Sequence, residues 1–248
     1  MRVLGVIPAR LGSTRLREKP LQLLRGKHLV VRVLERVVAL GVVDEVVVAT
    51  DAAEVAAAVE RSGGRAVLTS DQHESGTERI AEVLARPEFA GVETVLNVQG
   101  DEPFVTGAAV RGALDRLGRG DPIGTAAAAL DPAAIGDPAR VKVVTDVRGR
   151  AMYFSRAPIP YAHEEVGGYA VWQHLGIYAY TRDAVRRWVA LPRCEIEGVE
   201  RLEQLRPLYH GMTIGVALIG EPAAPGIDTP DDLVRAEAFW DDYAMGER

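Results

Sequence analysis

Cysteine is almost absent from this sequence: Cys194 is the only one in 248 residues. A single cysteine excludes an intrachain disulfide and is compatible with a reducing cytosol. No apolar stretch is long enough to cross a bilayer, and we expect no signal peptide because a predicted strand follows Met1 and Arg2 at once. The net charge of −6 argues against a general nucleic-acid binder. These absences predict a cytoplasmic globular protein with neither a membrane nor nucleic acid among its partners.

Two common nucleotide-binding motifs are also missing. The phosphate loop G-x-x-x-x-G-K-[ST] and the dinucleotide fingerprint G-x-G-x-x-G occur nowhere in the chain. Their absence weighs against an ordinary ATPase and against a nicotinamide-dependent dehydrogenase.

The first half of the chain alternates short apolar runs with helical patterns. The sequence predicts strands at residues 3–7, 45–50, 65–69 and 93–98, and helices at residues 29–40, 54–61, 77–86 and 108–117. Asp51 is the expected N-cap of the second helix. Such alternation, with continuously apolar strands, predicts the α/β class: a mostly parallel sheet with helices on both faces.

The second half has a different pattern. Turns that contain proline and glycine separate predicted strands at residues 124–130, 141–146, 149–154 and 169–180. This favours antiparallel pairing. We further predict a helix at residues 195–208 that Pro207 ends or distorts, a strand at 212–219, and a last helix at 230–243 with Thr229 as its N-cap.

A cationic loop follows the first predicted strand directly. Residues 10–27 hold six cations and one acid, Glu18. The cations are Arg10, Arg15, Arg17, Lys19, Arg25 and Lys27. Small residues in this loop let backbone N–H groups approach an anion, around which arginine and lysine side chains can close. Solvated surface charges are the alternative, but the place directly behind a buried strand favours an anion site that suits a triphosphate.

Two aspartates are candidate metal ligands. Asp101 follows the predicted strand at 93–98, and Asp228 precedes the last predicted helix. Ligands of such sheets bind beyond the carboxyl ends of the strands, where a carboxylate can hold Mg²⁺ together with substrate phosphates and water. An ordinary turn is the alternative at residues 99–103, and helix capping is the alternative at residues 226–232.

Other polar residues have both a structural and a functional interpretation. Ser75 and Glu78 form a potential capping box, while the small residues beside them could receive a flat base. In the second half, the candidates for binding an acidic sugar are Arg156, His174, Tyr178, Glu203 and Gln204. His174 and Tyr178 are four residues apart and share one face of a regular strand. The alternative for these two is a satisfied core histidine and a packing tyrosine.

An ordered set of motifs over nearly the whole chain resembles one enzyme family. The motifs are IPAR at 7–10, STRL at 13–16, KPL at 19–21, ATD at 49–51, SGTER at 75–79, NVQGDEP at 97–103, VKVV at 141–144, YFSR at 153–156, HLGIY at 174–178, LEQLR at 202–206 and DTP at 228–230. In this order they are similar to the 3-deoxy-manno-octulosonate (Kdo) cytidylyltransferases. The motifs of the second half distinguish this family from the related sialic acid cytidylyltransferases.

The resemblance implies a Rossmann-like nucleotidyltransferase fold with a smaller inserted subdomain that mediates dimerisation. The nucleotide-binding part would be roughly residues 1–130 and 210–248 of a single domain, and the sugar-binding and dimerisation part roughly residues 131–209. The implied reaction converts CTP and Kdo into CMP-Kdo and pyrophosphate for lipopolysaccharide biosynthesis, with Mg²⁺, in a homodimer. A cytidylyltransferase for another acid sugar and a non-catalytic nucleotide-sensing protein are the alternatives.

The resemblance also implies roles for single residues. Arg10, Lys19 and Asp101 would be catalytic, and Asp101 and Asp228 would bind Mg²⁺. The implied CTP contacts are Ala9, Arg10, Arg15, Lys19, Ser75, Gly76 and Arg79. The implied Kdo contacts are Gln99, Arg156, His174, Tyr178, Glu203 and Gln204.

Two stretches depart from the family pattern. The family has Pro-Gly where this chain has Arg17 and Glu18, so we expect the turn in the cationic loop to differ. The usual Asn-Pro-Asn before VKVV is replaced by residues 137–140, a change that we expect to affect a turn only.

Overall fold

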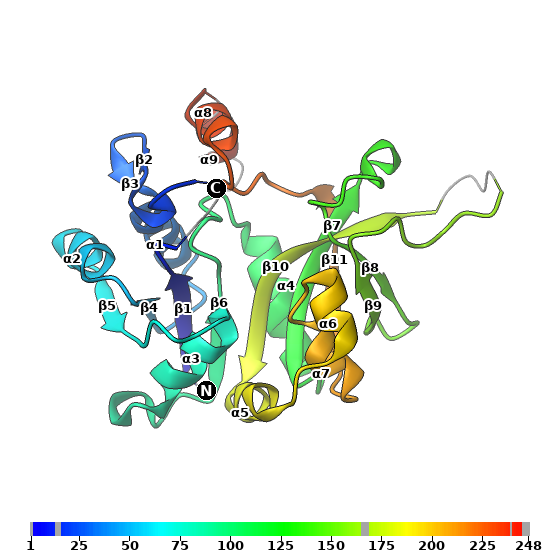
Figure 1. Cartoon of the computed structure of the whole chain (residues 1–248), viewed down its shortest axis with the longest axis horizontal. Helices are drawn as coiled ribbons and strands as arrows, with labels where there is room; N and C mark the ends of the chain where they lie inside the picture. The colour runs from blue at the N-terminus through cyan, green and yellow to red at the C-terminus, as the bar shows by residue number, and fades with distance from the viewer. Residues whose placement is uncertain (1, 13–15, 165–168, 239, 245–248) are drawn as a thin grey trace. The chain divides into compact units, whose positions relative to one another are not determined.

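Two structural units make up the computed structural model, which describes residues 2–12, 16–164, 169–238 and 240–244 (Figure 1). The first unit comprises residues 1–107 and 224–248, and the second comprises residues 108–223. The sequence predicted a single domain whose functional parts change near residues 130 and 210. The structural boundaries lie elsewhere, and the division of function between the two parts stays a prediction.

A parallel four-stranded sheet lies at the centre of the first unit. Its strands are β6 (Thr94–Asn97), β1 (Val3–Ala9), β4 (Glu45–Thr50) and β5 (Arg65–Leu68), in that order. The middle strands are buried on both faces, which explains their continuous apolar sequence. The predicted parallel sheet and its four strands are confirmed.

Three helices connect these strands: α1 (Leu29–Ala39), α2 (Ala53–Arg61) and α3 (Gly76–Ala85). The chain moves from β1 outward to β4 and β5, then returns to β6 on the other side of β1. Right-handed crossovers therefore place α1 and α2 on one face of the sheet and α3 on the other. The strand order reverses between β1 and β6, and this is where α/β sheets bind ligands.

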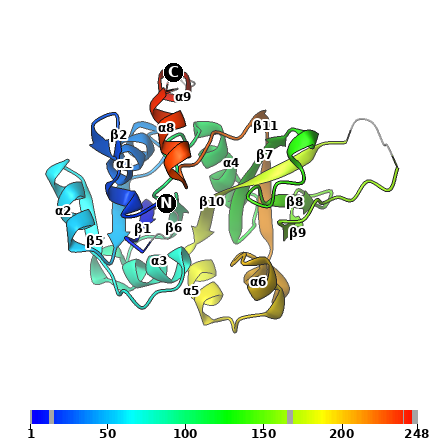
Figure 2. The same cartoon turned by 45° about the horizontal axis from the view of Figure 1, so that its top comes forward.

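Short elements complete the first unit. The hairpin of β2 (Leu23–Leu24) and β3 (Lys27–His28) lies beside α1 and α8 (Pro230–Ala238), as Figure 2 shows. A 3₁₀ turn, η1 (Lys19–Leu21), precedes the hairpin; another, η2 (Pro87–Phe89), follows α3; and α9 (Trp240–Ala244) follows α8.

The second unit has a mixed sheet. Its central strand β7 (Ile123–Leu130) pairs in parallel with β11 (Ile214–Pro222) and antiparallel with β10 (Val171–Thr181). Strand β8 (Lys142–Thr145) pairs antiparallel with β10 and with β9 (Ala151–Ser155). The predicted antiparallel pairing in this half is confirmed. The helices are α4 (Gly107–Gly118), which begins at the unit boundary, α5 (Arg182–Ala190), α6 (Glu195–Glu200) and α7 (Leu205–Tyr209), and η3 (Pro132–Ala134) is a 3₁₀ turn.

Two local predictions were wrong. The helix predicted at residues 195–208 is two helices, α6 and α7, because Arg201 takes a left-handed conformation with φ 52° and ends α6. Pro207 lies in the first turn of α7, where an N–H group has no partner within the helix, so it does not disturb that helix. Asp51 is not the N-cap of α2: Ala52 holds that position without a side-chain cap.

The other predicted caps are present. Ser75 Oγ accepts the Glu78 N–H at the start of α3, and Thr229 Oγ1 accepts the Asp232 N–H at the start of α8. Helix α5 was not predicted from the sequence. Within the described ranges, no helix has both the length and the apolar composition needed to span a bilayer.

A buried carboxylate organises one end of the second unit. Asp121 is 2% exposed and pairs with Arg116 at 2.6 Å and with Arg150 at 2.7 Å. The Arg116 guanidinium also donates to the Arg148 carbonyl at 3.0 Å, which fixes the turn between β8 and β9. Gly215 is required here, because a Cβ at this position would lie 2.2 Å from Arg116 Nε.

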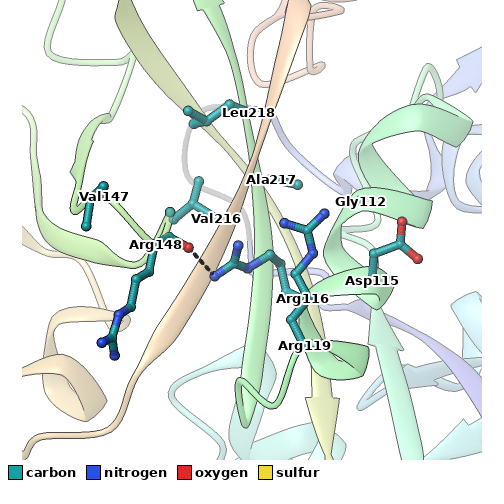
Figure 3. A pocket seen from close by; sticks show the side chains of 10 residues that line it. Gly112, Asp115, Arg116, Arg119, Val147, Arg148, Val216, Ala217 and Leu218 are labelled. Atoms are coloured by element: carbon teal, nitrogen blue, oxygen red, sulfur yellow. Dashed lines mark hydrogen bonds between the residues drawn. The ribbon is translucent and has the colours of Figure 1, made fainter.

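A pocket of about 380 Å³ lies between α4, β11 and this turn. Figure 3 shows the Arg116 guanidinium directed at the Arg148 carbonyl, whereas the Arg148 side chain extends away from it. We interpret this arginine cluster as an internal clamp on the β8–β9 turn.

Replacing Asp121→Asn tests this clamp. The variant leaves the buried Arg116 charge without a counter-ion, so we expect it to lower the free energy of unfolding by about 3 kcal/mol. The exposed Asp115 in the same pocket is the matched control; Asp115→Asn should change stability by less than about 0.5 kcal/mol. Urea denaturation measures both, and equal midpoints for the two variants would contradict the clamp.

Candidate active site

The loops that follow β1 and β6 meet at a pocket of about 320 Å³ in the first unit. This is the place where the strand order reverses. Six of the residues singled out in the sequence line the pocket: Ala9, Arg10, Lys19, Gln99, Asp101 and Asp228. The structure therefore brings these six residues together, although they come from both ends of the chain.

A smaller pocket of about 160 Å³ shares Pro8, Ala9, Arg10 and Gln99 with the first. Its remaining wall comes from the start of α3 and the residues before it, and includes the predicted Ser75, Gly76 and Arg79. The two pockets thus adjoin: the first contains two cations and two carboxylates, and the second combines small residues with Arg10 and Arg79.

Arg79 is firmly held in the smaller pocket. It is 3% exposed and pairs with Asp51 at 2.8 Å. It also donates to Thr69 Oγ1 and to the Ser70 carbonyl. Asp51 was read in the sequence as a helix cap, so its function as the partner of Arg79 was missed. The ATD sequence at the end of β4 was the available signal, because it places a carboxylate at the carboxyl end of a strand.

Lys19 joins the two candidate metal ligands. Its ammonium contacts Asp101 Oδ2 and lies 2.6 Å from Asp228 Oδ1. The Lys19 side chain is only 12% exposed. Burial lowers its pKa, but the two carboxylates outweigh that effect and raise the pKa of Lys19 above its ordinary value. A single cation therefore bridges acids that are far apart in the sequence.

A third acid lies beside this pair. Burial, followed by the negative charges of Asp101 and Asp228, raises the pKa of Glu102 well above its usual range. Gly226 permits its close approach, because a Cβ there would lie 2.8 Å from Glu102 Oε1. Glu102 was not singled out in the sequence analysis, where it was part of a possible turn.

An apolar cluster holds the three segments of the pocket together. Leu16 comes from the cationic loop, Phe104 follows Asp101, and Ile227 precedes Asp228. Leu24, Leu29 and Ala236 complete the buried set. The Ile227 N–H also donates to the Asp101 carbonyl at 3.0 Å. The two carboxylates are thus fixed by packing and by a backbone hydrogen bond as well as by Lys19.

The donor set fits Mg²⁺ bound together with a nucleotide. Among the described residues, no group of three or more histidine, cysteine, aspartate or glutamate side chains could hold a metal by itself. Mg²⁺ usually takes one or two carboxylates and completes its shell with phosphates and water. Asp101 and Asp228 already share one cation, the Lys19 ammonium, so their oxygens are close enough to share another.

The cationic loop is only partly described, and Arg15 lies outside the described residues. Arg10 is exposed at the pocket. Glu18, at the departure from the family pattern, takes a left-handed conformation with φ 48° and ψ 37°. That conformation suits glycine, the residue that the resemblance implies at this position.

The predicted sugar contacts of the second unit lie on β10 and around the end of β9. The Arg156 side chain donates to the carbonyls of Glu200 and Pro138, each at 2.9 Å. The Glu200 carboxylate accepts from the Arg156 N–H and from Ser155 Oγ. Because the guanidinium is held by neutral carbonyls, it keeps its positive charge available. Glu200 was missed in the sequence analysis.

His174 and Tyr178 remain close although β10 is irregular between them. Their ring centroids are 5.2 Å apart, and Tyr178 stacks on Tyr180. Thr125 Oγ1 donates to the Ile177 carbonyl, so it accepts a hydrogen bond from His174 Nε2. Burial lowers the pKa of His174 to about 3, so its ring is neutral at physiological pH.

Glu203 and Gln204 follow α6, and Glu203 lies close enough to Tyr178 to act on it electrostatically. Burial, with smaller contributions from Tyr180 and Glu203, raises the pKa of Tyr178 well above its ordinary value. Gln204 is 5% exposed. The second unit therefore brings Tyr178 and Glu203 within electrostatic range of each other. Gln99, the remaining predicted sugar contact, belongs to the first unit and lines both of its pockets.

Comparison with known proteins identifies the family. The family model for cytidylyltransferases matches residues 4–214. The chain belongs to the cytidylyltransferase family. It is similar to the 3-deoxy-manno-octulosonate cytidylyltransferase of Gemmatimonas aurantiaca, with 52% identity over 97% of this chain and 95% of the relative. The enzyme of the same name from Methylococcus capsulatus is 47% identical over 93% and 94% of the two chains.

Solved structures support the same assignment. This cytidylyltransferase is similar to CMP:2-keto-3-deoxy-manno-octonic acid synthetase complexed with CTP, with a TM-score of 0.90 and 38% identity over 98% of this chain and 99% of that chain. The predicted α/β nucleotidyltransferase fold is thereby confirmed. A 4-diphosphocytidyl-2C-methyl-D-erythritol synthase from Anaerococcus prevotii, with a TM-score of 0.60 and 17% identity, shares the fold alone.

Glu18 gives a test of strain in the cationic loop of this cytidylyltransferase. We expect Glu18→Gly to raise the free energy of unfolding by about 0.5–1 kcal/mol, because glycine carries no left-handed penalty. Arg17→Gly, at the neighbouring position without a positive φ, should lower stability instead. Urea denaturation measures both variants, and a loss of stability in Glu18→Gly equal to that in Arg17→Gly would refute the strain.

His174 gives a pH test. The unfolded chain binds a proton at this ring below about pH 6.5, whereas the folded ring stays neutral down to about pH 3. Stability should therefore fall as the pH drops below 6.5, by about 1.4 kcal/mol per pH unit from this residue. In His174→Gln, the loss between pH 7 and pH 5 should be smaller by about 2 kcal/mol. The exposed His163 is the control: His163→Gln should keep the wild-type loss, and identical profiles for both variants would contradict the assignment.

Proposed function

We propose that this protein transfers CMP from CTP to the anomeric hydroxyl of Kdo, forming CMP-Kdo and pyrophosphate for lipopolysaccharide biosynthesis. The observation that carries the proposal is the meeting of Lys19, Asp101 and Asp228 in a pocket that continues into a smaller one lined by Arg79. A metal-bound triphosphate suits the first pocket and a base suits the second. The Kdo enzymes among its relatives support the choice of sugar.

The nucleotide contacts divide between the two pockets. We assign Arg10, Arg15 and Lys19 to the triphosphate, since guanidinium and ammonium groups both bind phosphate oxygens. Ala9, Ser75, Gly76 and Arg79 are assigned to the cytidine. Arg79 is supported as a base contact by its fixed position, which Asp51 and Thr69 maintain before any ligand arrives.

The sugar contacts are assigned to Gln99, Arg156, His174, Tyr178, Glu203 and Gln204. Arg156 suits the Kdo carboxylate, because its guanidinium is held by two carbonyls and keeps its charge. The neutral His174 ring suits a sugar hydroxyl, since Nδ1 is left as an acceptor when Nε2 donates to Thr125.

The reaction is an in-line attack by the anomeric hydroxyl on the α-phosphorus. A bond forms between that oxygen and phosphorus, the bond from phosphorus to the pyrophosphate oxygen breaks, and the hydroxyl proton is released to water. Both substrates are anions, so Arg10 and Lys19 would reduce their repulsion and stabilise the charge on the departing pyrophosphate. Mg²⁺, held by Asp101 and Asp228, would supply further charge neutralisation and lower the pKa of a coordinated hydroxyl.

The proposal also includes a cellular location and an oligomeric state. We place the reaction in the cytoplasm, which the single cysteine and the choice of CTP as donor support. We also propose a homodimer, with residues 131–209 supplying the dimerisation part.

A pyrophosphate-release assay tests the function. With CTP, Mg²⁺ and a panel of acid sugars, we expect turnover with Kdo to exceed that with its 8-amino relative and with sialic acid. Faster turnover with another sugar would reassign the acceptor, and CTP binding without turnover for any sugar would refute catalysis.

Asp101→Asn tests the metal-ligand assignment within the same assay. Because the amide lacks the charge that holds a metal, kcat should fall by about 10²–10³-fold, while circular dichroism shows a folded protein. Asp115→Asn removes the same charge from the surface of the second unit and should leave kcat unchanged. Turnover near the parent level in Asp101→Asn would remove this residue from the metal site.

A further inference from the structure

The Lys19 ammonium lies where a metal ion would contact Asp101 and Asp228. We propose that Lys19 occupies this position until a triphosphate binds, so that the divalent cation can enter the site only together with the nucleotide. The inference rests on the proposed function for the identity of the metal ligands. It adds a role for Lys19 before catalysis, as a cation that is displaced.

The contacts of Lys19 carry the first step. Its ammonium is bonded to one oxygen of each carboxylate, at 2.6 Å from Asp228 Oδ1. A metal ion shared by the same two carboxylates would lie close to the ammonium and repel it. The two cations therefore compete for one pair of carboxylates.

Releasing Lys19 from the two carboxylates leaves its ammonium without a counter-ion. Its side chain is mostly buried, and a buried charge without a counter-ion is costly. A displaced Lys19 would have lost both of its carboxylate partners. The exposed Arg10 at the same pocket already lacks an ion-pair partner among the residues that the structure describes. Once a metal ion takes both carboxylates, the pocket would hold two cationic side chains with no anion left to pair with them. A triphosphate supplies such an anion, so its arrival removes the obstacle to releasing Lys19 from the carboxylates.

The backbone around Lys19 limits what can move. Lys19 begins η1, where the Leu21 N–H donates to the Glu18 carbonyl at 2.8 Å and the Gln22 N–H donates to the Lys19 carbonyl at 3.2 Å. Pro20 is buried. The exchange therefore needs only rotation of the long Lys19 side chain, and the loop backbone keeps its place.

The consequence is positive coupling between metal and nucleotide. Because coupling between two ligands is reciprocal, the factor by which CTP strengthens metal binding equals the factor by which the metal strengthens CTP binding. Removing the Lys19 charge should remove much of this coupling. It should strengthen metal binding to the nucleotide-free protein.

Electron paramagnetic resonance of free Mn²⁺ tests this in the absence of nucleotide. We expect Lys19→Met to bind Mn²⁺ about tenfold or more tighter than wild type, within the usual range of coupling between sites. Lys19→Arg keeps the charge and should remain weak. Lys27→Met removes an exposed lysine that pairs with Glu35 in the same unit, and it should also behave like wild type.

A second substitution locates the bound ion. Adding Asp228→Asn to Lys19→Met should abolish the gain, because the ion then lacks one of its two carboxylates. Mn²⁺ should also raise the melting temperature of Lys19→Met more than that of wild type. If Lys19→Met fails to fold, Lys19→Gln keeps hydrogen bonding to the carboxylates without the charge and replaces it in every comparison.

The inference is overturned if wild type binds Mn²⁺ as tightly as the variant without charge at position 19, or if Lys27→Met gains as much. Failure of the proposed function gives a different result. If no acid sugar is turned over but Lys19→Met still gains Mn²⁺ affinity through Asp228, the displacement of Lys19 is supported and the proposed reaction is refuted. If Kdo is turned over but Lys19→Met binds Mn²⁺ no tighter than wild type, the proposed reaction is supported and the displacement of Lys19 is refuted.

Discussion

The ionic contact of Lys19 with Asp101 and Asp228 is the constraint on which the first unit depends most. Each of the three residues belongs to a different segment of the chain, so the contact joins segments that are far apart in the sequence. Leu16, Phe104 and Ile227, from the same three segments, pack together in a buried cluster that excludes water. Apolar packing and charge pairing thus act on the same three segments, so their backbone is positioned before a ligand binds.

The same principle recurs in the second unit with the signs reversed. There a single carboxylate, Asp121, serves two guanidinium groups and fixes a turn. In both units the shared central ion is at most 12% exposed, so each contact is weakly screened by solvent and strongly directional. Arg156 illustrates the contrasting arrangement: carbonyl acceptors orient it without neutralising it. A protein that binds two anionic substrates needs both kinds of cation.

Much of this could be predicted from the sequence because periodicity and strand ends are local signals. The apolar strands of the first half predicted the sheet, and the sheet in turn predicted that the loops after its first and last strands begin at one edge. What failed depended on distant partners. Asp51 has the sequence of a helix cap, yet it pairs with Arg79, whose position depends on another helix. The break at Arg201 depends on one backbone conformation that no periodic pattern records. The contacts of Glu102 and Glu200 come from residues distant in the sequence, so no local signal in the sequence marked either residue.

The first unit is interrupted in the sequence, since residues 224–248 return to it after the whole second unit. During synthesis, Asp101 and Lys19 leave the ribosome long before Asp228 and Ile227 exist. The apolar side chains at the junction must wait for their last partners, and the two early ions form an incomplete pair. A nascent chain can therefore fold most of its sheet, but it cannot present a finished pocket. The order of translation itself keeps the unfinished protein inactive.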